Sequence, residues 1–262
     1  PNLYSGAGWH AFMAGFYREG GSHKAGLDAL ARYAREEWQR INQLVVVTPE
    51  QQVEFHNAVR LLVLLSRSYA EWSREQDPNY FVRVVAVEQP FEVHIPGTNY
   101  VLAGRIDLLV EDRWGQIWPL DHKSTTGGWP DADLLRLNTQ FECYWFGAKA
   151  LFPDRRVPGV IYNGVRLTNP KTAKKEVFYR KGIRYPEAAV ESIYRKLLAL
   201  VEMHEAMQGA DYIRPQPGMH CSWKCAYTEL CIATENQTDL SALIEELYVI
   251  DNGTPNYLRG DD

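Results

Sequence analysis

Two aspartates and a lysine in one short stretch are residue types that metal-assisted hydrolysis uses. The stretch Gly104–Lys123, GRIDLLVEDRWGQIWPLDHK, has two apolar, β-branched runs around a turn-like break, which predicts a β-hairpin. Asp107 lies in the first predicted strand. Asp121 and Lys123 stand two residues apart at the end of the second, so their side chains share one face. Such a set suits a divalent cation beside a water that attacks a phosphate, although Asp-x-Lys alone occurs on any surface strand.

A second pair of polar residues follows on a predicted helix. The segment Asp131–Phe152 has apolar side chains at helical spacing and is predicted to form one long helix. Gln140 and Tyr144 are four residues apart within it and therefore lie on one face.

In their order and spacing, three motifs resemble the RecB-like branch of the PD-(D/E)XK nuclease superfamily. That branch includes the nuclease domains of RecB and AddAB, CRISPR-associated prespacer-trimming nucleases and many phage exonucleases. The motifs are Gly104-x-x-Asp107, Asp121-x-Lys123 and Gln140-x-x-x-Tyr144.

The resemblance implies a fold and an activity. The fold is α/β, with a PD-(D/E)XK restriction-endonuclease-like core: a small mixed sheet flanked by helices, here with a cysteine-bearing C-terminal tail. The activity is phosphodiester hydrolysis in DNA. The catalytic residues implied are Asp107, Asp121, Lys123, Gln140 and Tyr144.

The resemblance also implies a metal site. Asp107 and Asp121 supply carboxylates and the backbone carbonyl of His122 supplies a further oxygen, which suits Mg²⁺. Gly6-x-x-x-His10 resembles the helix whose histidine adds a nitrogen ligand, and a nitrogen ligand also fits Mn²⁺. Without the resemblance, a histidine in an apolar helix is more often a packed residue.

The acid Glu88 has two interpretations. It is either a solvated charge at a strand end, or an outer acidic group of the site, since related nucleases often place a glutamate on the preceding strand. Lys123 is expected to act as a point charge that orients the attacking water.

The elements that position these residues can also be predicted. Thr48 is expected to cap a helix that runs to about Glu75 and ends at Asp77-Pro78-Asn79, because Pro49 and Gln51 complete the start signal. The other predicted helices are 5–17, 22–42, 186–208 and 238–249, and the other strands are 81–88, 91–95, 157–166 and 175–181.

A basic segment stands out in an otherwise acidic chain. The segment from Arg166 to Arg184 contains seven Lys or Arg residues and one acidic residue, whereas the whole chain has a net charge of −5. It is either a solvated hairpin or a DNA-contact surface in which cations bind phosphates and aromatic residues stack on bases. The predicted contacts are Lys171, Lys174, Lys175, Arg180, Lys181 and Arg184.

Three cysteines crowd near the C-terminus. Cys221, Cys225 and Cys231 resemble the C-terminal triplet of iron–sulfur members of the same branch, which implies a structural [4Fe–4S] cluster whose fourth cysteine is not in this chain. Two alternatives remain open: a zinc site completed by His220, or three packed thiols. Cys143 lies in the predicted helix and is interpreted as a small buried side chain.

Composition bounds the remaining questions. With 262 residues and 45% hydrophobic content, we expect one globular domain. We divide it into a helical part (1–80), a catalytic core (81–208), a cysteine segment (209–235) and a C-terminal helix and tail (236–262). No apolar run is long enough to span a membrane and no signal peptide is visible, so we expect the cytoplasm of a bacterial, archaeal or phage-infected cell.

The sequence therefore predicts a metal-dependent DNA nuclease. It is expected to be an exonuclease acting on single strands or duplex ends in recombination, repair or phage DNA processing, with other recombination or adaptation proteins as partners. The alternatives are a CRISPR spacer-processing nuclease and a catalytically silent nucleic-acid-binding module of the same fold. A redox or zinc protein would leave the hairpin motif unexplained.

Overall fold

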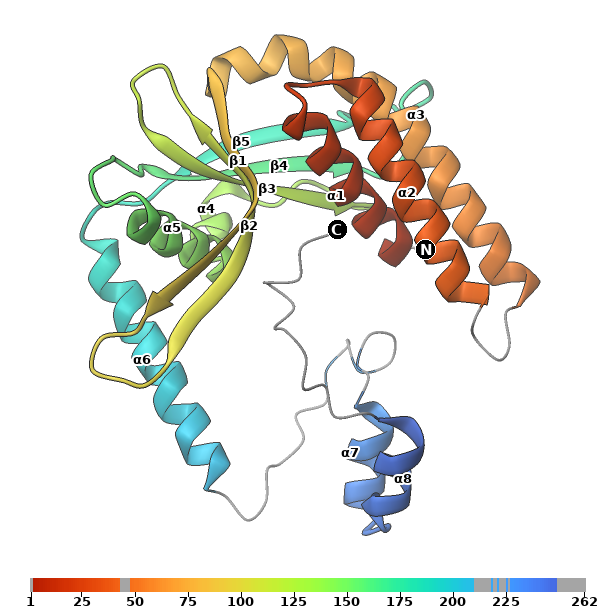
Figure 1. Ribbon diagram of the computed structural model, residues 1–262, viewed down its shortest axis with the longest axis vertical. Coiled ribbons are helices and arrows are strands. Elements are labelled where there is room, and N and C mark those ends of the chain that lie inside the picture. Colours follow the sequence, from red (N-terminus) through yellow and green to blue (C-terminus); the bar gives the residue numbers. More distant parts are fainter. Residues whose placement is uncertain are drawn as a thin grey trace. The chain divides into compact units, whose positions relative to one another are not determined.

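A computed structural model describes residues 2–42, 48–209, 218, 221, 225 and 227–248 (Figure 1). The chain falls into two compact units, residues 1–196 and 197–262. The helices are α1 (Asn2–Arg18), α2 (His23–Asn42), α3 (Pro49–Tyr80), α4 (Ala132–Leu135), α5 (Thr139–Leu151), α6 (Ala189–Gln208), α7 (Thr228–Glu235) and α8 (Leu240–Leu247). The strands are β1 (Arg83–His94), β2 (Val101–Glu111), β3 (Ile117–Thr125), β4 (Gly159–Arg166) and β5 (Phe178–Arg184).

The five strands form one mixed sheet in the order β1-β2-β3-β4-β5. Neighbouring strands are antiparallel except β3 and β4, which are parallel and joined through α4 and α5. This arrangement confirms the predicted α/β class and the small mixed sheet flanked by helices.

The β2–β3 hairpin is fixed by its turn. Asp112 accepts hydrogen bonds from the backbone N–H groups of Trp114 and Gln116 and from the indole N–H of Trp118. Gly115 adopts a φ of +74°, a left-handed conformation that glycine takes without steric cost. The tight turn sets the register of the two strands and so brings Asp107 opposite Asp121.

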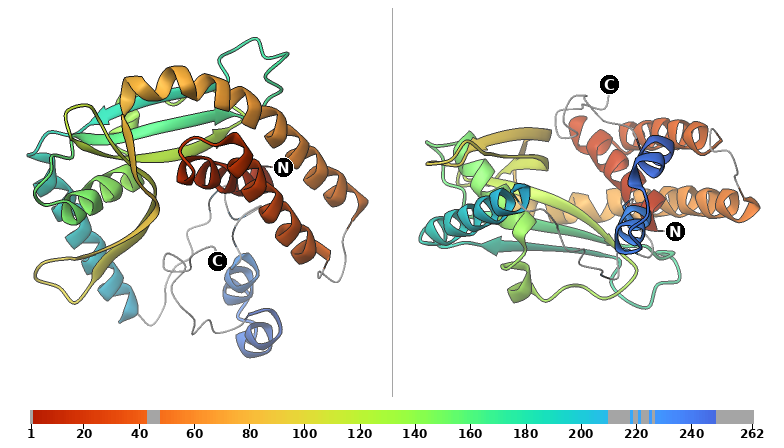
Figure 2. Two further views of the ribbon diagram at one scale, coloured as in Figure 1. Left: turned by 45° about the horizontal axis from the view of Figure 1, so that its top comes forward. Right: turned by 90° about the horizontal axis from the view of Figure 1, so that it is seen from below.

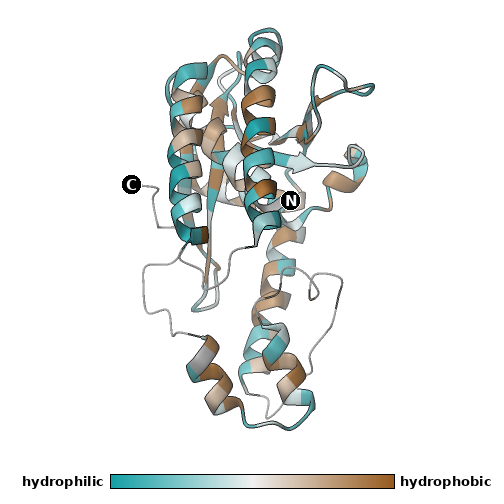
Figure 3. Ribbon diagram, turned by 90° about the vertical axis from the view of Figure 1, so that its right-hand side faces the viewer, coloured by the Kyte–Doolittle hydropathy of each residue, from teal (hydrophilic) through white to brown (hydrophobic). Residues whose placement is uncertain are grey.

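Helices cover the two faces of the sheet differently (Figures 1 and 2). One face packs on α1 and α3, with a core that includes Trp9, Phe12, Leu108, Leu120 and Ile161. The other face packs on α5 across β1 to β4. Hydrophilic and hydrophobic residues alternate along the helices in Figure 3, as expected when each helix buries one side.

The capping prediction at Thr48 is confirmed, but the predicted end of that helix is wrong. Thr48 and Gln51 form a capping box. The helix α3 then continues through Pro78 to Tyr80. Beside Pro78, Asp77 is held through both its polar groups: its carbonyl accepts from Phe81 N–H and its carboxylate from Arg180.

Several other boundaries differ from expectation, among them β5, which was predicted at 175–181 and lies at Phe178–Arg184. The strands predicted at 81–88 and 91–95 are a single strand, β1, with an irregular register after Val84. The helix predicted over 131–152 is split into α4 and α5, because the Asn138 side chain caps the second helix by accepting from Phe141 N–H. The helix α7 was not predicted.

No helix within the described part of the chain combines the length and the apolar character needed to cross a membrane.

Candidate active site

The predicted carboxylates lie where two paired strands separate. The strands β2 and β3 pair only from Leu108–Leu120 to Glu111–Ile117. Beyond Leu108 and Leu120, β2 stays paired with β1 and β3 stays paired with β4. Asp107 and Asp121 occupy the next position on each strand, so they face each other across the opening.

A backbone donor from β3 bridges this opening. The N–H of His122, which has no partner on β2, donates to Asp107 Oδ2 at 2.8 Å. The strand separation therefore both exposes a backbone donor and orients the carboxylate that accepts from it.

Asp121 is completely buried and only partly hydrogen-bonded. The Lys123 ammonium lies 2.9 Å from both carboxylate oxygens of Asp121, but is aligned for a hydrogen bond only with Oδ1. Among the described residues, no donor is aligned for a hydrogen bond with Asp121 Oδ2. Lys123 offsets one negative charge, so when Asp107 is ionised as well, the two buried carboxylates carry one charge more than this lysine can balance.

The predicted helix pair reaches the same lysine. Lys123 Nζ donates to Gln140 Oε1 at 2.8 Å, and Gln140 Nε2 donates to the Tyr144 hydroxyl at 2.9 Å. Both residues come from α5, whose first turn is set by the Asn138 cap. The structure thus brings Asp121, Lys123, Gln140 and Tyr144 into one hydrogen-bonded chain.

Three potential metal ligands converge beside Asp107. Ligand atoms of His10, Glu88 and Asp107 all lie within 4.8 Å of one another. His10 Nδ1 is 3.4 Å from Asp107 Oδ2. One nitrogen and two carboxylates are a donor set that suits Mn²⁺ or Mg²⁺.

Glu88 therefore belongs to the site and is not a solvated strand end. The neighbouring pairs Val87–Leu108 and Gln89–Ile106 place it opposite Asp107 in the register. Its φ of +53° is unusual for a residue with a side chain, and its carboxylate is 2.9 Å from Arg105 Nε. Asp121, which we predicted as a metal ligand, is not part of the three-residue group, and it is held by Lys123 instead.

The electrostatics of the site follow from burial. Burial raises the pKa of Asp107, and burial together with the nearby Asp107 charge raises the pKa of Asp121, despite the opposing effect of Lys123. Burial lowers the pKa of His10, which favours the neutral ring that can bind a metal. A bound cation would compensate the two carboxylates, so the residues present fit a divalent metal.

Close packing around Phe91 explains the glycine of the first motif. A Cβ at Gly104 would lie 2.9 Å from the Phe91 ring, and a Cβ at Gly147 of α5 would lie 2.5 Å from it. The ring also contacts Tyr144 edge-on at 6.3 Å between centroids. The two glycines let β1, β2 and α5 approach closely enough for Gln140 to reach Lys123.

A second buried polar cluster lies behind the site, and the sequence interpretation missed it. His122 Nδ1 is 2.9 Å from Asn163 Nδ2, so the ring nitrogen accepts and the amide donates. Asn163 Oδ1 in turn accepts from Arg180 Nε at 2.9 Å. The one sequence signal was an asparagine inside an otherwise apolar strand, GVIYNGVR.

The prediction that Arg180 contacts nucleic acid is wrong. Arg180 is only 5% exposed. Its guanidinium also donates to Asp77 at 2.6 Å, Tyr69 at 2.9 Å and Tyr17 at 3.2 Å. Alternation along β5 turns Arg180 toward α3 while its exposed neighbour Lys181 points to the other face.

The remaining predicted contacts are exposed, but they are not all on one face. Lys171, Lys174 and Lys175 lie between β4 and β5. Lys181 pairs with Tyr162, which pairs with Asp121, so alternation puts Lys181 on the same face as Asp121 and Lys123. The Arg184 guanidinium lies 5.0 Å over the Trp118 ring, on the opposite face from Lys123.

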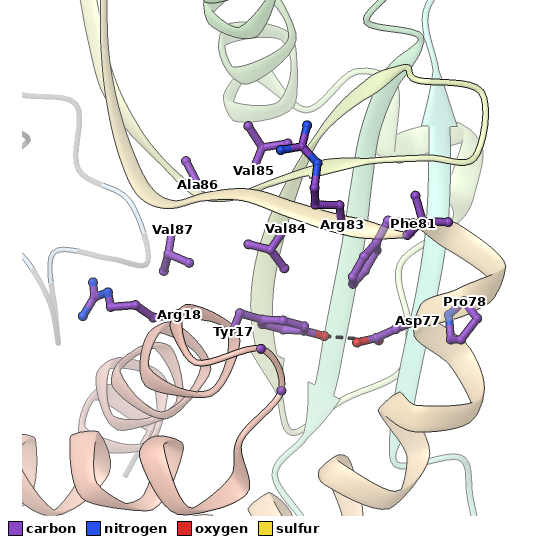
Figure 4. A pocket seen from close by; sticks show the side chains of 13 residues that line it. Tyr17, Arg18, Asp77, Pro78, Phe81, Arg83, Val84, Val85, Ala86 and Val87 are labelled. Carbon is purple, nitrogen blue, oxygen red and sulfur yellow. Dashed lines mark hydrogen bonds between the residues drawn. The ribbon is translucent and has the colours of Figure 1, made fainter.

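One pocket does not include the predicted catalytic residues in its lining. It has a volume of about 790 Å³ and is lined by the ends of α1 and α3 and the start of β1. Figure 4 shows the hydrogen bond between Tyr17 and Asp77 at its wall.

The cysteine segment lies in the second unit. Cys221, Cys225 and Cys231 are free thiols, and Thr228 Oγ1 donates to the backbone oxygens of Cys221 and Cys225. The three sulfur atoms do not lie within 4.8 Å of one another. His220 falls outside the described residues, so the cluster and its zinc alternative stay predictions.

Comparison with known proteins identifies the class that this site and fold define. The sequence matches the PD-(D/E)XK nuclease superfamily over residues 3–232, and the chain belongs to that superfamily. Its nucleases generally use divalent metals and act on nucleic acids. No curated protein matches the chain. A solved structure, described as the crystal structure of SSO0001, is similar over 70% of this chain and 78% of that one, with 15% identity and a TM-score of 0.36.

Proposed function

We propose that this chain is a metal-dependent DNA nuclease of the RecB-like branch, acting as an exonuclease on DNA ends. The observation that carries the proposal is the pair of buried carboxylates at the β2–β3 separation, with a lysine beside one of them and a histidine beside the other. An arrangement that buries two acids at unfavourable cost is expected where a cation and a phosphate bind.

The metal would be held by His10, Glu88 and Asp107, with Asp121 and the backbone carbonyl of His122 as the further ligands that the resemblance implies. When bound, a divalent cation activates water and neutralises phosphate charge. The chain's own contribution is to hold these donors in place before substrate arrives.

Lys123 has one N–H group that no hydrogen bond within the described part of the chain uses. Its ammonium has three N–H groups, and two of them are used by Asp121 Oδ1 and Gln140 Oε1. The third can donate to the attacking water or to a phosphate oxygen. Gln140 and Tyr144 fix the lysine and thereby the direction of that donor.

A cleavage assay tests the proposal. End-labelled single-stranded, blunt duplex and closed circular DNA would be offered with Mg²⁺, Mn²⁺ or EDTA. We expect metal-dependent loss of the linear substrates, resistance of the circle, and a label pattern that gives the polarity.

Two lysine variants on neighbouring elements give a matched comparison. Lys123→Ala should lose roughly 10³-fold in rate, because several kcal/mol of transition-state stabilisation are removed. Lys149→Ala, which removes a lysine of α5 paired with Glu187, should keep full activity. Full activity of Lys123→Ala would refute the mechanism, and binding without cleavage by the unaltered protein would favour the silent binding module.

The cysteine segment has its own test. We propose that Cys221, Cys225 and Cys231 bind a [4Fe–4S] cluster with a fourth cysteine from outside this chain. Anaerobically purified protein should then contain iron and absorb broadly in the visible range, and Cys225→Ser should lose both signals.

A further inference from the structure

Exposed apolar side chains lie in the segment that joins Lys123 to Gln140. Leu134 and Leu137 are 66% and 70% exposed, and Trp129 is partly exposed. Single exposed apolar residues are common and need no explanation. Here they fall in the one segment whose flanking residues, Lys123 and Gln140, hydrogen-bond to each other at the candidate active site.

Trp129 is placed next to the catalytic lysine by a glycine. Gly164 pairs with Lys123 across the β3–β4 ladder, and a Cβ at Gly164 would lie 2.8 Å from the Trp129 ring. The missing side chain lets the indole lie against the sheet at that position. The buried indole N–H of Trp129 has no hydrogen-bond partner among the described residues.

Planar groups from β4 and β5 extend this aromatic surface. The rings of Trp129 and Tyr179 stack at 5.5 Å with an angle of 19° between their planes. The Arg166 guanidinium lies 5.0 Å from the Trp129 ring centroid. Tyr179 pairs with Gly164, so lysine, indole and phenol follow one line across the sheet.

The charge near Trp129 is positive on the β4–β5 side, whereas the segment before Gln140 carries two exposed acids, Asp131 and Asp133, the second of them 3.9 Å from Arg136 Nε. Lys181 is on the same face, and Lys171, Lys174 and Lys175 are exposed between the two strands. A single acid, Glu176, lies among them, and its backbone oxygen accepts from Arg166 Nε. Cations flanking stacked planar groups complement a polyanion that carries flat, unpaired bases.

We infer that Trp129, Arg166 and Tyr179, here called the Trp129 surface, bind unpaired bases of a single strand that leads to Lys123. In a duplex the base faces stack on each other, so aromatic and planar cationic groups gain little from them. The inference rests on the proposed function and sharpens it: the substrate class is a single-stranded polynucleotide or an unpaired DNA end.

Binding measurements in EDTA test the surface apart from cleavage. Fluorescence anisotropy with labelled single-stranded and duplex oligonucleotides would compare Trp129→Ala with the unaltered chain. We expect Trp129→Ala to bind the single strand roughly 5- to 150-fold more weakly, which corresponds to the loss of one stacked base. Binding of the duplex should change little. The control is Trp114→Ala, since Trp114 is 66% exposed and also lies under an arginine, but in the distant β2–β3 turn.

A cycle with abasic oligonucleotides separates stacking from misfolding. Removing one base at a time should weaken binding at one or two positions in the unaltered chain, and those positions should have no further effect in Trp129→Ala. Effects that add at every position, equal losses on single-stranded and duplex DNA, or no DNA binding would overturn the inference. If the abasic effect disappears in Trp129→Ala but the protein cleaves no DNA with metal, the inference about the Trp129 surface is supported and the proposed nuclease activity is refuted. If the protein cleaves DNA but the abasic effect persists in Trp129→Ala, the nuclease proposal is supported and the inference is refuted.

Discussion

Two buried charged clusters lie on opposite faces of β3, built on the neighbouring residues Asp121 and His122. Behind the sheet, the Arg180 cluster comprises Arg180, Asp77, Asn163, Tyr17 and Tyr69. Its guanidinium donates to all four of the other side chains. A buried ion with this many hydrogen bonds is compensated within the protein.

On the other face, the Asp121 cluster, formed by Asp107, Asp121, Lys123, His10 and Glu88, is only partly compensated. Its three carboxylates meet two cations, Lys123 beside Asp121 and Arg105 beside Glu88. Burial raises the pKa of both aspartates, as it also does for Asp77, but Asp77 has its own cation and Asp107 does not. The same strand therefore carries a cluster whose charges are satisfied and one whose charges call for an added cation. This difference in charge compensation distinguishes a cluster with a structural role from one suited to binding a cation, which burial alone does not.

The largest expected effect is loss of the Arg180 charge. Arg180→Met should destabilise the protein by about 3–5 kcal/mol, because the partly buried Asp77 would lose its cation and the buried Asn163 and Tyr69 would lose a donor. Urea unfolding followed by circular dichroism would measure the change. Lys181→Met, at the exposed neighbouring position, should shift the unfolding free energy by less than about 0.5 kcal/mol. Equal effects of the two substitutions would contradict the distinction between the clusters.

Arg180 also shows what sequence patterns could not resolve. A run of basic residues does not tell which cation is buried, because that depends on Asp77, which is 103 residues away in the chain. The same holds for Glu88, whose place opposite Asp107 comes from the pairing of β1 with β2 and from a positive φ.

The parts that were predictable are set by local chemistry. The hairpin and the shared face of Asp121 and Lys123 follow from strand periodicity and a turn that Asp112 and Gly115 stabilise. The bond between Lys123 and Gln140 was not derivable from spacing, since it needs the close contact that Gly104 and Gly147 allow at Phe91. Only the order of the motifs indicated it.

Metal binding should give the next largest effect, and only at the Asp121 cluster. Mn²⁺ or Mg²⁺ at about 100 times its dissociation constant should stabilise the unaltered chain by about 2.7 kcal/mol over the same protein in EDTA. His10→Ala should lose most of this gain, because it removes the nitrogen ligand. His94→Ala, an exposed histidine of β1, is the control and should retain it. Urea midpoints with and without metal provide the measurement.

Replacing a buried acid should have opposite signs at two positions. In EDTA at pH 8, Asp121→Asn should stabilise the protein by about 1 kcal/mol, the gain typical of relieving a strained functional site. Asp112→Asn should destabilise it by about 1.5–3 kcal/mol, because that carboxylate accepts three hydrogen bonds. Destabilisation by Asp121→Asn as large as that by Asp112→Asn would mean that Asp121 is a structural acid.

The smallest expected effect is the pH dependence of the metal-free protein. Burial and the Asp107 charge raise the folded-state pKa of Asp121 to about 7. The contribution of this protonated acid to the unfolding free energy is therefore complete below its unfolded pKa near 3.9 and is lost as pH rises through 7. Burial lowers the pKa values of His10 and His122. Their contribution to the unfolding free energy therefore rises with pH, mainly below about pH 6.5.

Between about pH 6.5 and 8.5 the contribution of the histidines fades as pH rises, and the raised pKa of Asp121 gives the slope its sign. The unfolding free energy in EDTA should fall as pH rises, by less than about 1.4 kcal/mol per pH unit. The slope should flatten in Asp121→Asn, and saturating Mg²⁺ should remove it because the cation binds the ionised carboxylates. If the pH dependence of the unfolding free energy is unchanged in Asp121→Asn, another group is responsible for it. The contrast between the two faces of β3 would then not explain where the metal binds.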